Sequence, residues 1–492
     1  MLCLGIDIGT SAVKALISDD RDVTVAASEV PLTLERPRDG WAEQDPDAWW
    51  LAVQQAMAAL RKEIGSRMAD VAAIGLSGQM HGAVLIDSQD RSLRPAILWN
   101  DGRSIEECRL LNETVPDLAA TLGVPAMPGL TLPKLLWIAR HQPDLHRRIA
   151  HVLLPKDYIR LKLTGTRATD MSDAAGTLLL DQATRSWWPT ALAAAGLTPD
   201  QMPTLLEGTA ISGELGRAVA SHLGLTAGIP VAAGAGDAAA GAIGIGAVSD
   251  GDSFISLGTS CQLFVTTDSY RPNPRAFVHA FAHGLPGRWF QMAAMLNGAS
   301  ALAWAASVLG GEPIASLLAE VETTANPVSP VTFLPYLQGE RTPHNDADAR
   351  GVFFGMDGGT RRRDLVQSVL EGVAFTLADA QRELATSGTI AESYALIGGG
   401  ARSPLWTEII ASALGRPVRL LAGGEKGPAL GAARLARIAV TGAPPAAVCT
   451  KPEIAAEIWP DPRRQDALAR RFELFSELYL ALKPVFRKAS DR

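Results

Sequence analysis

The chain has 492 residues, of which 47% are hydrophobic and 20% are charged, and its formal net charge is −7. This length exceeds the size at which a single hydrophobic core stops growing, so we expect at least two domains. The modest acidic charge, without a long run of lysine or arginine, argues against nucleic-acid and membrane-surface partners. The sequence also contains no apolar run long enough to predict a membrane span.

The four cysteines are far apart in the sequence and form neither a CxxC pair nor a cluster with histidine. This spacing argues against a disulfide framework and against a zinc site. Reduced thiols are typical of the cytoplasm, and the first residues reach the acidic Asp7 too early for a signal peptide. We therefore expect a cytoplasmic protein. The cysteines are Cys3, Cys108, Cys261 and Cys449.

The first residues predict a series of short strands, Leu2–Ile8, Val13–Ile17 and Val23–Val30. The turn after the first strand reads Asp7-Ile8-Gly9-Thr10-Ser11 and combines a carboxylate, backbone N–H groups and two hydroxyls. Such groups suit a phosphate and its magnesium ion. An Asx-type hairpin turn explains the same five residues equally well.

A further predicted strand, Val71–Leu76, ends in the turn Ser77–Gly82, which reads SGQMHG. Loops at strand ends commonly carry binding residues, so Met80 and His81 are candidates for the wall of a ligand pocket. The alternative for His81 is an ordinary surface turn residue.

A second polar cluster follows the predicted strand Ala96–Trp99. Trp99, Asn100, Asp101 and Arg103 together supply an apolar wall beside hydrogen-bond donors and acceptors. This mixture is typical of a site for a polyol or a sugar.

Asp237 is the one charged residue in the stretch Val231–Gly246, which reads VAAGAGDAAAGAIGIG. Glycine lacks a Cβ, so such a stretch lets backbone and ligand approach closely. A carboxylate among small apolar residues has little water around it and needs a partner or a chemical role. Asp237 is therefore either a turn or cap residue in a buried corner or a catalytic group.

The pattern of the first turn recurs in the second half of the chain. A predicted strand, Ser253–Leu257, leads into Gly258-Thr259-Ser260 and then into another strand, Gln262–Val265. Ile8–Ser11 and Leu257–Ser260 are thus two copies of one strand–turn–strand unit. An internal duplication predicts two similar domains. Two such turns that face each other would hold a polyphosphate between the domains.

A glycine-rich loop, Gly398-Gly399-Gly400, follows the predicted strand Tyr394–Ile397 and precedes a helix. It predicts close contact with the nucleoside part of a nucleotide. The chain has no GxxxxGK(S/T) motif, and Ala239 replaces the third glycine of a dinucleotide-binding loop, which argues against a P-loop and a Rossmann dehydrogenase. The duplicated turn and this loop fit phosphoryl transfer from ATP, in which Asp237 would accept the proton of the acceptor hydroxyl.

With these motifs, the sequence resembles the FGGY family of carbohydrate kinases, which belongs to the actin–hexokinase–heat-shock ATPase superfamily. The resemblance covers nearly the whole chain. Two long stretches, Gly129–Ile138 and Gly351–Glu371, match the signatures of the family. The shorter motifs SGQMHG, LWNDGR, GAGD and GERTPHNDADARG are similar to those of members that act on the ketopentose D-xylulose.

The resemblance implies roles for individual residues. Asp237 would be the general base on the terminal hydroxyl of the sugar, and it would share a Mg²⁺ ion with Asp7. The sugar pocket would be formed by Met80, His81, Trp99, Asn100, Asp101, Arg103 and Asp237. ATP would be contacted by Thr10, Ser11, Lys14, Gly258, Thr259, Gly399, Gly400 and Ser403. Lys14 fits a solvent-facing strand residue equally well, and Ala238 departs from the polar residue, commonly Asn, that the resemblance predicts after the base.

The resemblance further implies an α/β fold of two duplicated actin/hexokinase-like domains, of the ribonuclease H-like type, around a hinged cleft. Residues 1–245 would form an N-terminal FGGY domain with the sugar site and the first phosphate turn. Residues 246–492 would form a C-terminal FGGY domain with the ATP site and the second phosphate turn. A homodimer is expected from the family.

The implied activity is the phosphorylation of the terminal hydroxyl of D-xylulose by ATP and Mg²⁺, giving D-xylulose 5-phosphate and ADP. One alternative is an FGGY kinase for another ketose or a polyol, such as D-ribulose, L-ribulose or xylitol. A second alternative is a sugar-independent ATPase with the same core, which gives no reason for Asp237 to lie beside a pocket that contains Met80 and His81.

Overall fold

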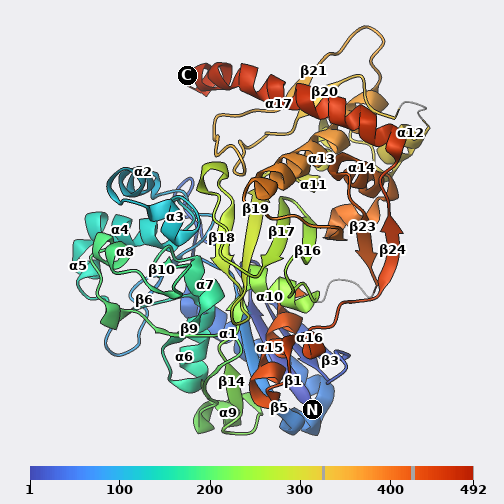
Figure 1. Cartoon of the computed structure of the whole chain (residues 1–492). Coiled ribbons are helices and arrows are strands. Elements are labelled where there is room, and N and C mark those ends of the chain that lie inside the picture. Colours follow the sequence, from blue (N-terminus) through green and yellow to red (C-terminus); the bar gives the residue numbers. More distant parts are fainter. Residues whose placement is uncertain (324–326, 423–426, 491–492) are drawn as a thin grey trace.

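The computed structural model describes residues 1–323, 327–422 and 427–490 and has two lobes, each built on a seven-stranded mixed sheet (Figure 1). The first sheet contains, in spatial order, β13 (Ile211–Glu214), β14 (Pro230–Ala232), β5 (Val71–Gly78), β1 (Leu2–Ile8), β2 (Ala12–Ser18) and β3 (Thr24–Pro31), with β15 (Ala235–Gly236) paired to β5. The second contains β18 (His279–Ala282), β19 (Trp289–Met295), β17 (Cys261–Thr267), β16 (Ser253–Leu257), β22 (Tyr394–Ile397), β23 (Val418–Leu421) and β24 (Ile454–Ile458).

The two sheets repeat one topology. In the first, β1, β2 and β3 form an antiparallel meander, and β1 also pairs in parallel with β5, which pairs in parallel with β14. In the second, β16, β17 and β19 form the meander, and β16 pairs in parallel with β22, which pairs in parallel with β23. An antiparallel strand, β13 or β24, completes each pattern. The prediction of a duplicated α/β fold is therefore confirmed, whereas the boundary at residues 245 and 246 stays a prediction.

Helices cover the sheets because each has an apolar face that the strands bury. α1 (Pro46–Ile64) starts at its N-cap Asp45, whose side chain accepts a hydrogen bond from the backbone N of Asp47, and it buries Trp49, Val53 and Met57. The helices of the second lobe include α11 (Ala299–Val308), α12 (Ile314–Glu322), α13 (Arg362–Thr386), α14 (Pro404–Leu414) and α17 (Pro462–Ser490).

Further helices and two-stranded sheets belong to the first lobe, and most of them extend it on one side, whereas α6 packs on the main sheet and α9 lies beside β14 (Figure 1). The helices are α2 (Ile105–Thr114), α3 (Leu118–Leu122), α4 (Thr131–His141), α5 (Pro143–His146), α6 (Pro155–Thr164), α7 (Met171–Ala175), α8 (Pro189–Ala194) and α9 (Arg217–Leu223). The small sheets pair β4 (Glu43–Gln44) with β7 (Ala96–Ile97), β6 (Val84–Ile86) with β8 (His151–Leu153), β9 (Ala168–Asp170) with β12 (Thr204–Leu206) and β10 (Leu180–Asp181) with β11 (Ser186–Trp187). In the second lobe β20 (Thr332–Leu334) pairs with β21 (Val352–Phe354), and α16 (Pro445–Val448) precedes β24.

One helix from the end of the chain packs on the sheet formed by its beginning. α15 (Gly427–Thr441) lies against β1 and β5, and α10 (Asp237–Gly244) packs beside it (Figure 1). The approach is so close that a Cβ on Gly75 would lie 1.9 Å from the backbone O of Ala432, and one on Gly431 would lie 1.9 Å from that of Ala240. Glycine is required at these contacts because backbone meets backbone directly.

Among the described residues, no helix combines the length and the apolar character that crossing a membrane requires.

Candidate active site

A cavity of about 190 Å³ lies between the lobes, with Asp237 in its wall. The first lobe contributes Thr10, Met80, His81, Trp99, Met127, Gly129, Leu130, Asp237 and Ala238. The second lobe contributes Gln262, His279, Met292, Ala294 and Arg341. Of the residues predicted for the site, the structure thus brings Thr10, Met80, His81, Trp99 and Asp237 together around one cavity.

Asp237 is the first residue of α10, whose other residues are alanine, glycine and isoleucine. Its Oδ1 accepts a hydrogen bond from the backbone N of Ala238 at 2.8 Å. Burial and, after it, the charge of nearby Asp7 raise the pKa of Asp237 to about 7. A carboxylate that titrates near neutral pH is well matched to accepting a proton from a substrate.

Asp7 lies near the end of β1, where it pairs across the sheet with Lys14 of β2. Its Oδ1 is buried and has no hydrogen-bond partner among the residues that the structure describes. Burial raises the pKa of Asp7 to about 6, against the opposing effects of the Ser77 hydroxyl and, after it, of the charge of Lys14. An unpaired carboxylate oxygen in such a place is suited to a cation or to a water molecule that a cation holds.

Within residues 1–323, 327–422 and 427–490, no group of three or more His, Cys, Asp and Glu could enclose a metal ion. Asp7 and Asp237 are nevertheless close enough for the charge of one to act on the pKa of the other. Mg²⁺ commonly takes one or two protein carboxylates and completes its shell with water and substrate phosphates. The two side chains therefore fit such an ion, but they do not form a complete protein cage.

His81 is held in an unusual backbone conformation, with φ +71°. Its Nδ1 lies 2.7 Å from the backbone O of Gly176, so Nδ1 carries the proton and Nε2 is an acceptor. A Cβ at position 176 would lie only 2.5 Å from Nδ1, which explains the glycine. Burial and then the charge of Lys134 lower the pKa of His81 to about 3, so the imidazole is neutral at physiological pH.

Lys134 on α4 is a residue of the site to which no role was assigned from the sequence. Its Nζ donates to the backbone O of His81 at 2.8 Å, and the hydroxyl of Thr131 donates to the same oxygen at 3.0 Å. The side chain of Lys134 is fully buried, and burial lowers its pKa to about 7. The only feature of the sequence that could have indicated a role for Lys134 is its place as a lysine within an otherwise apolar part of a predicted helix. Its ammonium fixes the turn that carries His81.

A short chain of hydrogen bonds joins the predicted sugar wall to the first phosphate turn. Trp99 Nε1 donates to the hydroxyl of Thr10 at 2.9 Å, and this hydroxyl donates to Gln79 Oε1 at 2.9 Å. The ring of Trp99 remains 40% exposed. Displacement of the turn would therefore also move the aromatic wall of the cavity.

Asn100, Asp101 and Arg103 lie behind this wall, and they are not among the residues that line the cavity. Asp101 Oδ2 accepts from the backbone N of Ala42 and from Arg103 Nη2, each at 2.6 Å. Arg103 also contacts Glu43 at 2.7 Å and stacks on the ring of another tryptophan. Since Asp101 and Arg103 are already paired, their positions indicate support of the loop, whereas Asn100 Oδ1 is buried without a hydrogen-bond partner among the described residues. Contact of any of the three with a sugar stays a prediction.

A second cavity, of about 880 Å³, lies beside the glycine-rich loop. Its wall includes Gly398, Gly399, Ala401, Arg402, Leu396, Ile397, Leu421, Ala422, Leu430, Arg434, Thr450, Pro452 and Glu453, together with Arg21, Asp22, Gly244 and Ile245. α10 thus begins at one cavity with Asp237 and ends at the other with Gly244. Its eight residues span about 12 Å.

The other residues predicted for ATP, apart from Thr10 and Gly399, are not among the residues that line either cavity. Gly400 packs on Leu257, and Ser403 caps α14 by accepting a hydrogen bond from the backbone N of Trp406 at 3.2 Å. The backbone O atoms of Gly258 and Thr259 accept hydrogen bonds from the start of α11. Ser11 and Lys14 are exposed, and Lys14 Nζ lies 3.9 Å from Glu29.

A fully buried network of charged groups lies beneath the loop that leads to Asp237. Lys156 Nζ contacts Asp157, Asp170 and Asp173 at 2.7, 2.8 and 3.0 Å. Burial acts to lower the pKa of Lys156, but the three carboxyl groups outweigh it and raise the pKa. Burial raises the pKa of Asp173 well above its usual range, against the opposing charge of Lys156.

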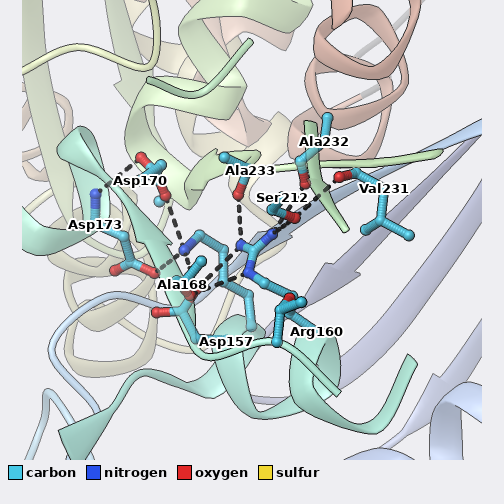
Figure 2. A network of polar contacts seen from close by, with 12 residues as sticks. Asp157, Arg160, Ala168, Asp170, Asp173, Ser212, Val231, Ala232 and Ala233 are labelled. Carbon is cyan, nitrogen blue, oxygen red and sulfur yellow. Dashed lines mark hydrogen bonds and ion pairs between the residues drawn. The ribbon is translucent and has the colours of Figure 1, made fainter. Parts of the chain in front are cut away.

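Arg160 extends this network to β14, the strand that precedes the loop leading to Asp237 (Figure 2). Its guanidinium points at the backbone O atoms of Ala232 and Ala233, and it donates to both. It also donates to the hydroxyl of Ser212 at 2.6 Å and contacts Asp157 at 3.1 Å. The backbone that leads into Asp237 is therefore fixed by a buried cation.

The second lobe supplies lining residues that sequence reasoning missed. Gln262 follows Cys261 in β17, His279 begins β18, and Arg341 lies in the loop between β20 and β21. Arg341 belongs to the GERTPHNDADARG motif. This motif indicated the family, but it did not indicate that Arg341 lines the cavity. None of the three is near Asp237 in sequence, so only the packing of the lobes brings them to the cavity.

Comparisons with known proteins place the chain in a family. Residues 2–244 match the N-terminal domain of the FGGY family of carbohydrate kinases, and residues 253–440 match its C-terminal domain. The chain is 46% identical to xylulose kinase of Escherichia coli K12 over 98% of this chain and 99% of that protein. It is 44% identical to xylulose kinase of Klebsiella pneumoniae over the same shares of the two chains.

Solved structures agree with these relatives. A crystal structure described as a xyloylose kinase from Brucella ovis is 46% identical, with a TM-score of 0.96 and coverage of 99% of this chain and 100% of that one. Xylulose kinase from Rhodospirillum rubrum is 31% identical, with a TM-score of 0.93 and the same coverage. The chain therefore belongs to the FGGY family of carbohydrate kinases.

Proposed function

We propose that this chain transfers the γ-phosphoryl group of ATP to the terminal hydroxyl of D-xylulose, giving D-xylulose 5-phosphate and ADP. The observation that carries the proposal is Asp237, whose carboxylate lies in a cavity between the lobes and has its pKa raised to about 7. The choice of acceptor is supported by similarity to xylulose kinases over nearly the full chain.

Asp237 acts as the general base. It takes the proton of the terminal hydroxyl as that oxygen attacks the γ-phosphorus, and the bond from the γ-phosphorus to the bridging oxygen of ADP breaks. Phosphoryl transfer depends mainly on positioning and on stabilisation of charge, so a fixed carboxylate at the start of a rigid helix suits this task.

The acceptor lies along the wall formed by Met80, His81 and Trp99. The neutral imidazole of His81 accepts a hydrogen bond from a sugar hydroxyl through Nε2, since Nδ1 is committed to Gly176. The ring of Trp99 gives an apolar face for the carbon chain. Ala238 leaves the position after the base without a polar side chain, so recognition falls to other groups of the cavity.

Asp7 and Asp237 would hold a Mg²⁺ ion, whose remaining positions water and phosphate oxygens would fill. The buried and unpaired Oδ1 of Asp7 supports this assignment. When bound, such an ion neutralises charge on the phosphates of ATP. Thr10 and Thr259, in the two corresponding turns, lie at the two sides of the phosphate chain.

The nucleoside of ATP occupies the cavity beside Gly399, and the phosphates extend along α10 toward Asp237. This helix spans about 12 Å between the two cavities. A ribose with three phosphates in extended form has a comparable length. A cytoplasmic location and a homodimer remain predictions of the sequence.

Two alternative activities can be distinguished from the proposed one by their response to the acceptor. Another ketose or polyol kinase of the family would keep Asp237 and the nucleotide cavity but prefer a different acceptor. A sugar-independent ATPase would hydrolyse ATP at a rate that no acceptor changes. The acceptor cavity with Met80, His81 and Asp237 in one wall favours the sugar kinase.

The test is ADP production with Mg²⁺ and ATP in the presence of D-xylulose, D-ribulose, L-xylulose, L-ribulose, glycerol, xylitol or no acceptor. We expect D-xylulose to give the highest kcat/KM. Preference for another sugar would overturn the acceptor but keep the reaction. Equal rates with and without every acceptor would overturn the kinase function.

A further inference from the structure

Arg341 brings a positive charge to the acceptor cavity, and the charge of the neighbouring Glu340 acts on it without forming an ion pair. Its side chain is half-buried, lines the cavity, and makes no hydrogen bond or ion pair with any residue that the structure describes. The neighbouring Glu340 does not pair with it, because Glu340 Oε1 accepts hydrogen bonds from the backbone N atoms of Leu296 and Arg341 at 2.7 and 2.8 Å. A cation kept in a cavity without a partner indicates that a ligand supplies the acceptor.

The backbone on both sides of Arg341 is fixed to the second lobe. Before it, Glu340 holds the end of β19, and Asn297 donates to the backbone O of Gly339 at 2.9 Å. After it, the hydroxyl of Thr342 donates to the backbone O of Phe277 at 3.0 Å. The guanidinium therefore projects from a rigid position, which is a requirement for specific recognition.

Arg341 and Asp237 mark different parts of the same cavity. Burial is the main reason that the pKa values of His81 and His279 are lowered to about 3, but the positive charge of Arg341 also contributes to both. The charge that acts on Asp237 is instead that of Asp7. The contacts of the next residue agree, because Thr342 donates from its backbone N to the backbone O of Ala294 and from its hydroxyl to that of Phe277, two residues before His279. Arg341 therefore lies on the His279 side of the cavity, whereas Asp237 begins α10 in the first lobe.

The chemistry of the acceptor matches this separation. A 2-ketopentose closes its ring through O5, the oxygen that is phosphorylated. A free hydroxyl on C5 therefore exists only in the open chain, in which C2 is a ketone. With O5 at Asp237, the ketone oxygen lies three carbon–carbon bonds along the chain. It is an acceptor, whereas an arginine only donates.

We propose that Arg341 is the specificity-determining residue that recognises the ketone oxygen of the open-chain acceptor. This inference rests on the proposed function. It explains how the cavity distinguishes a ketose from the polyol of the same length. A hydroxyl at C2 is a weaker partner for a cation than a carbonyl oxygen, and it brings a hydrogen that Arg341 cannot accept.

The experiment compares D-xylulose with xylitol and D-arabitol, the two polyols that differ from it only by reduction at C2. The variants are Arg341→Met and Arg341→Lys, with Arg275→Met as the control, because Arg275 is exposed and outside the cavity. For each protein, kcat/KM is measured with each acceptor, and thermal unfolding confirms that the variant is folded.

We expect Arg341→Met to lower kcat/KM for D-xylulose by about 10- to 100-fold, the range for loss of a hydrogen bond to a charged group. The values for the polyols should change much less, so the ketose preference collapses. Arg341→Lys, which keeps the charge but loses the planar fork, should retain part of the preference. Arg275→Met should behave as wild type.

An equal loss for ketose and polyols in Arg341→Met would overturn the inference and assign a general role in binding. If that variant does not fold, an unchanged ketose-to-polyol ratio in Arg341→Lys has the same consequence. The wild-type protein tests the proposed function separately. If that function is wrong, the wild-type protein will not phosphorylate D-xylulose, and the inference about Arg341 is then wrong as well.

Discussion

The hydroxyl of Ser172 accepts a hydrogen bond from the backbone N of Gly236 at 3.1 Å, one residue before Asp237. At the other end of the same short segment, the backbone O of Gly176 lies 2.7 Å from Nδ1 of His81. α7 and its C-cap therefore position both the proposed base and the proposed sugar-binding imidazole. Asp170 caps this helix, and the buried Lys156 holds Asp170.

Ser172→Ala should lower kcat about tenfold and leave the KM for ATP unchanged, because a small displacement of Asp237 affects the chemical step more than nucleotide binding. Steady-state kinetics with D-xylulose measure both values. The exposed Ser186 provides a matched control, and Ser186→Ala should behave as wild type. A rise in the KM for ATP with an unchanged kcat would contradict the positioning role.

Lys156→Met should destabilise the protein by about 3–5 kcal/mol, because it leaves buried carboxyl groups without their cation. For a lobe of this size, the unfolding temperature would fall by about 10 °C. The comparison is Lys162→Met, since Lys162 forms a more exposed pair with Asp47 at 3.2 Å. That variant should lose less than about 1 kcal/mol. Equal losses in the two variants would show that the buried network contributes no more than a surface pair.

The sequence was sufficient to predict the elements that carry local signals. Two Gly-Thr-Ser turns between strands predicted the duplicated sheets, and the corresponding pairing of β1 with β2 and of β16 with β17 confirms them. Asp237 was a candidate because a lone carboxylate in an alanine- and glycine-rich stretch is either a turn or cap residue or a chemical group, and the structure places it in the wall of the cavity. Repeated motifs and unusual local composition can be recognised in the sequence without knowledge of the tertiary structure.

Other residues could not be placed from the sequence, because their surroundings are tertiary. Asp101 and Arg103 have the chemistry of sugar ligands, yet their polar atoms are paired with each other and with Glu43 behind the cavity wall. His279 and Arg341 lie on the second lobe, and they share a cavity with Asp237 only because the two lobes pack together. The docking of α15 on the first sheet likewise depends on glycines that are distant in sequence.

The pH dependence of activity should report Asp237. Because the base must be ionised, and because burial and Asp7 raise its pKa to about 7, kcat/KM for D-xylulose should rise with pH and level off above about 7. ADP production between pH 5.5 and 9, in buffers of constant ionic strength, measures the profile. A bound Mg²⁺ ion would move the midpoint downward. A rate that falls as pH rises from 6 to 8 would contradict a carboxylate base.

Gly75→Ala should lower the unfolding temperature, because its Cβ would lie 1.9 Å from the backbone O of Ala432 and would force α15 away from β5. The matched control is Gly358→Ala, where the added Cβ meets no atom within 4 Å. Differential scanning calorimetry of both variants measures the effect. Unfolding at the wild-type temperature in Gly75→Ala would mean that the contact between α15 and the sheet is not close in solution.

The central claim is that Asp237 is the base, and Asp237→Asn tests it most directly. The variant should remain folded. The raised pKa of Asp237 contributes stability below about pH 4 that is lost as pH rises through about 7, so a neutral side chain should be at least as stable as wild type at pH 8. Turnover of D-xylulose in single-turnover assays, with ATP binding measured in parallel, then isolates the chemical step. We predict a loss of at least about 10³-fold in turnover with ATP affinity within a few fold of wild type. Turnover within tenfold of wild type would remove Asp237 from the reaction.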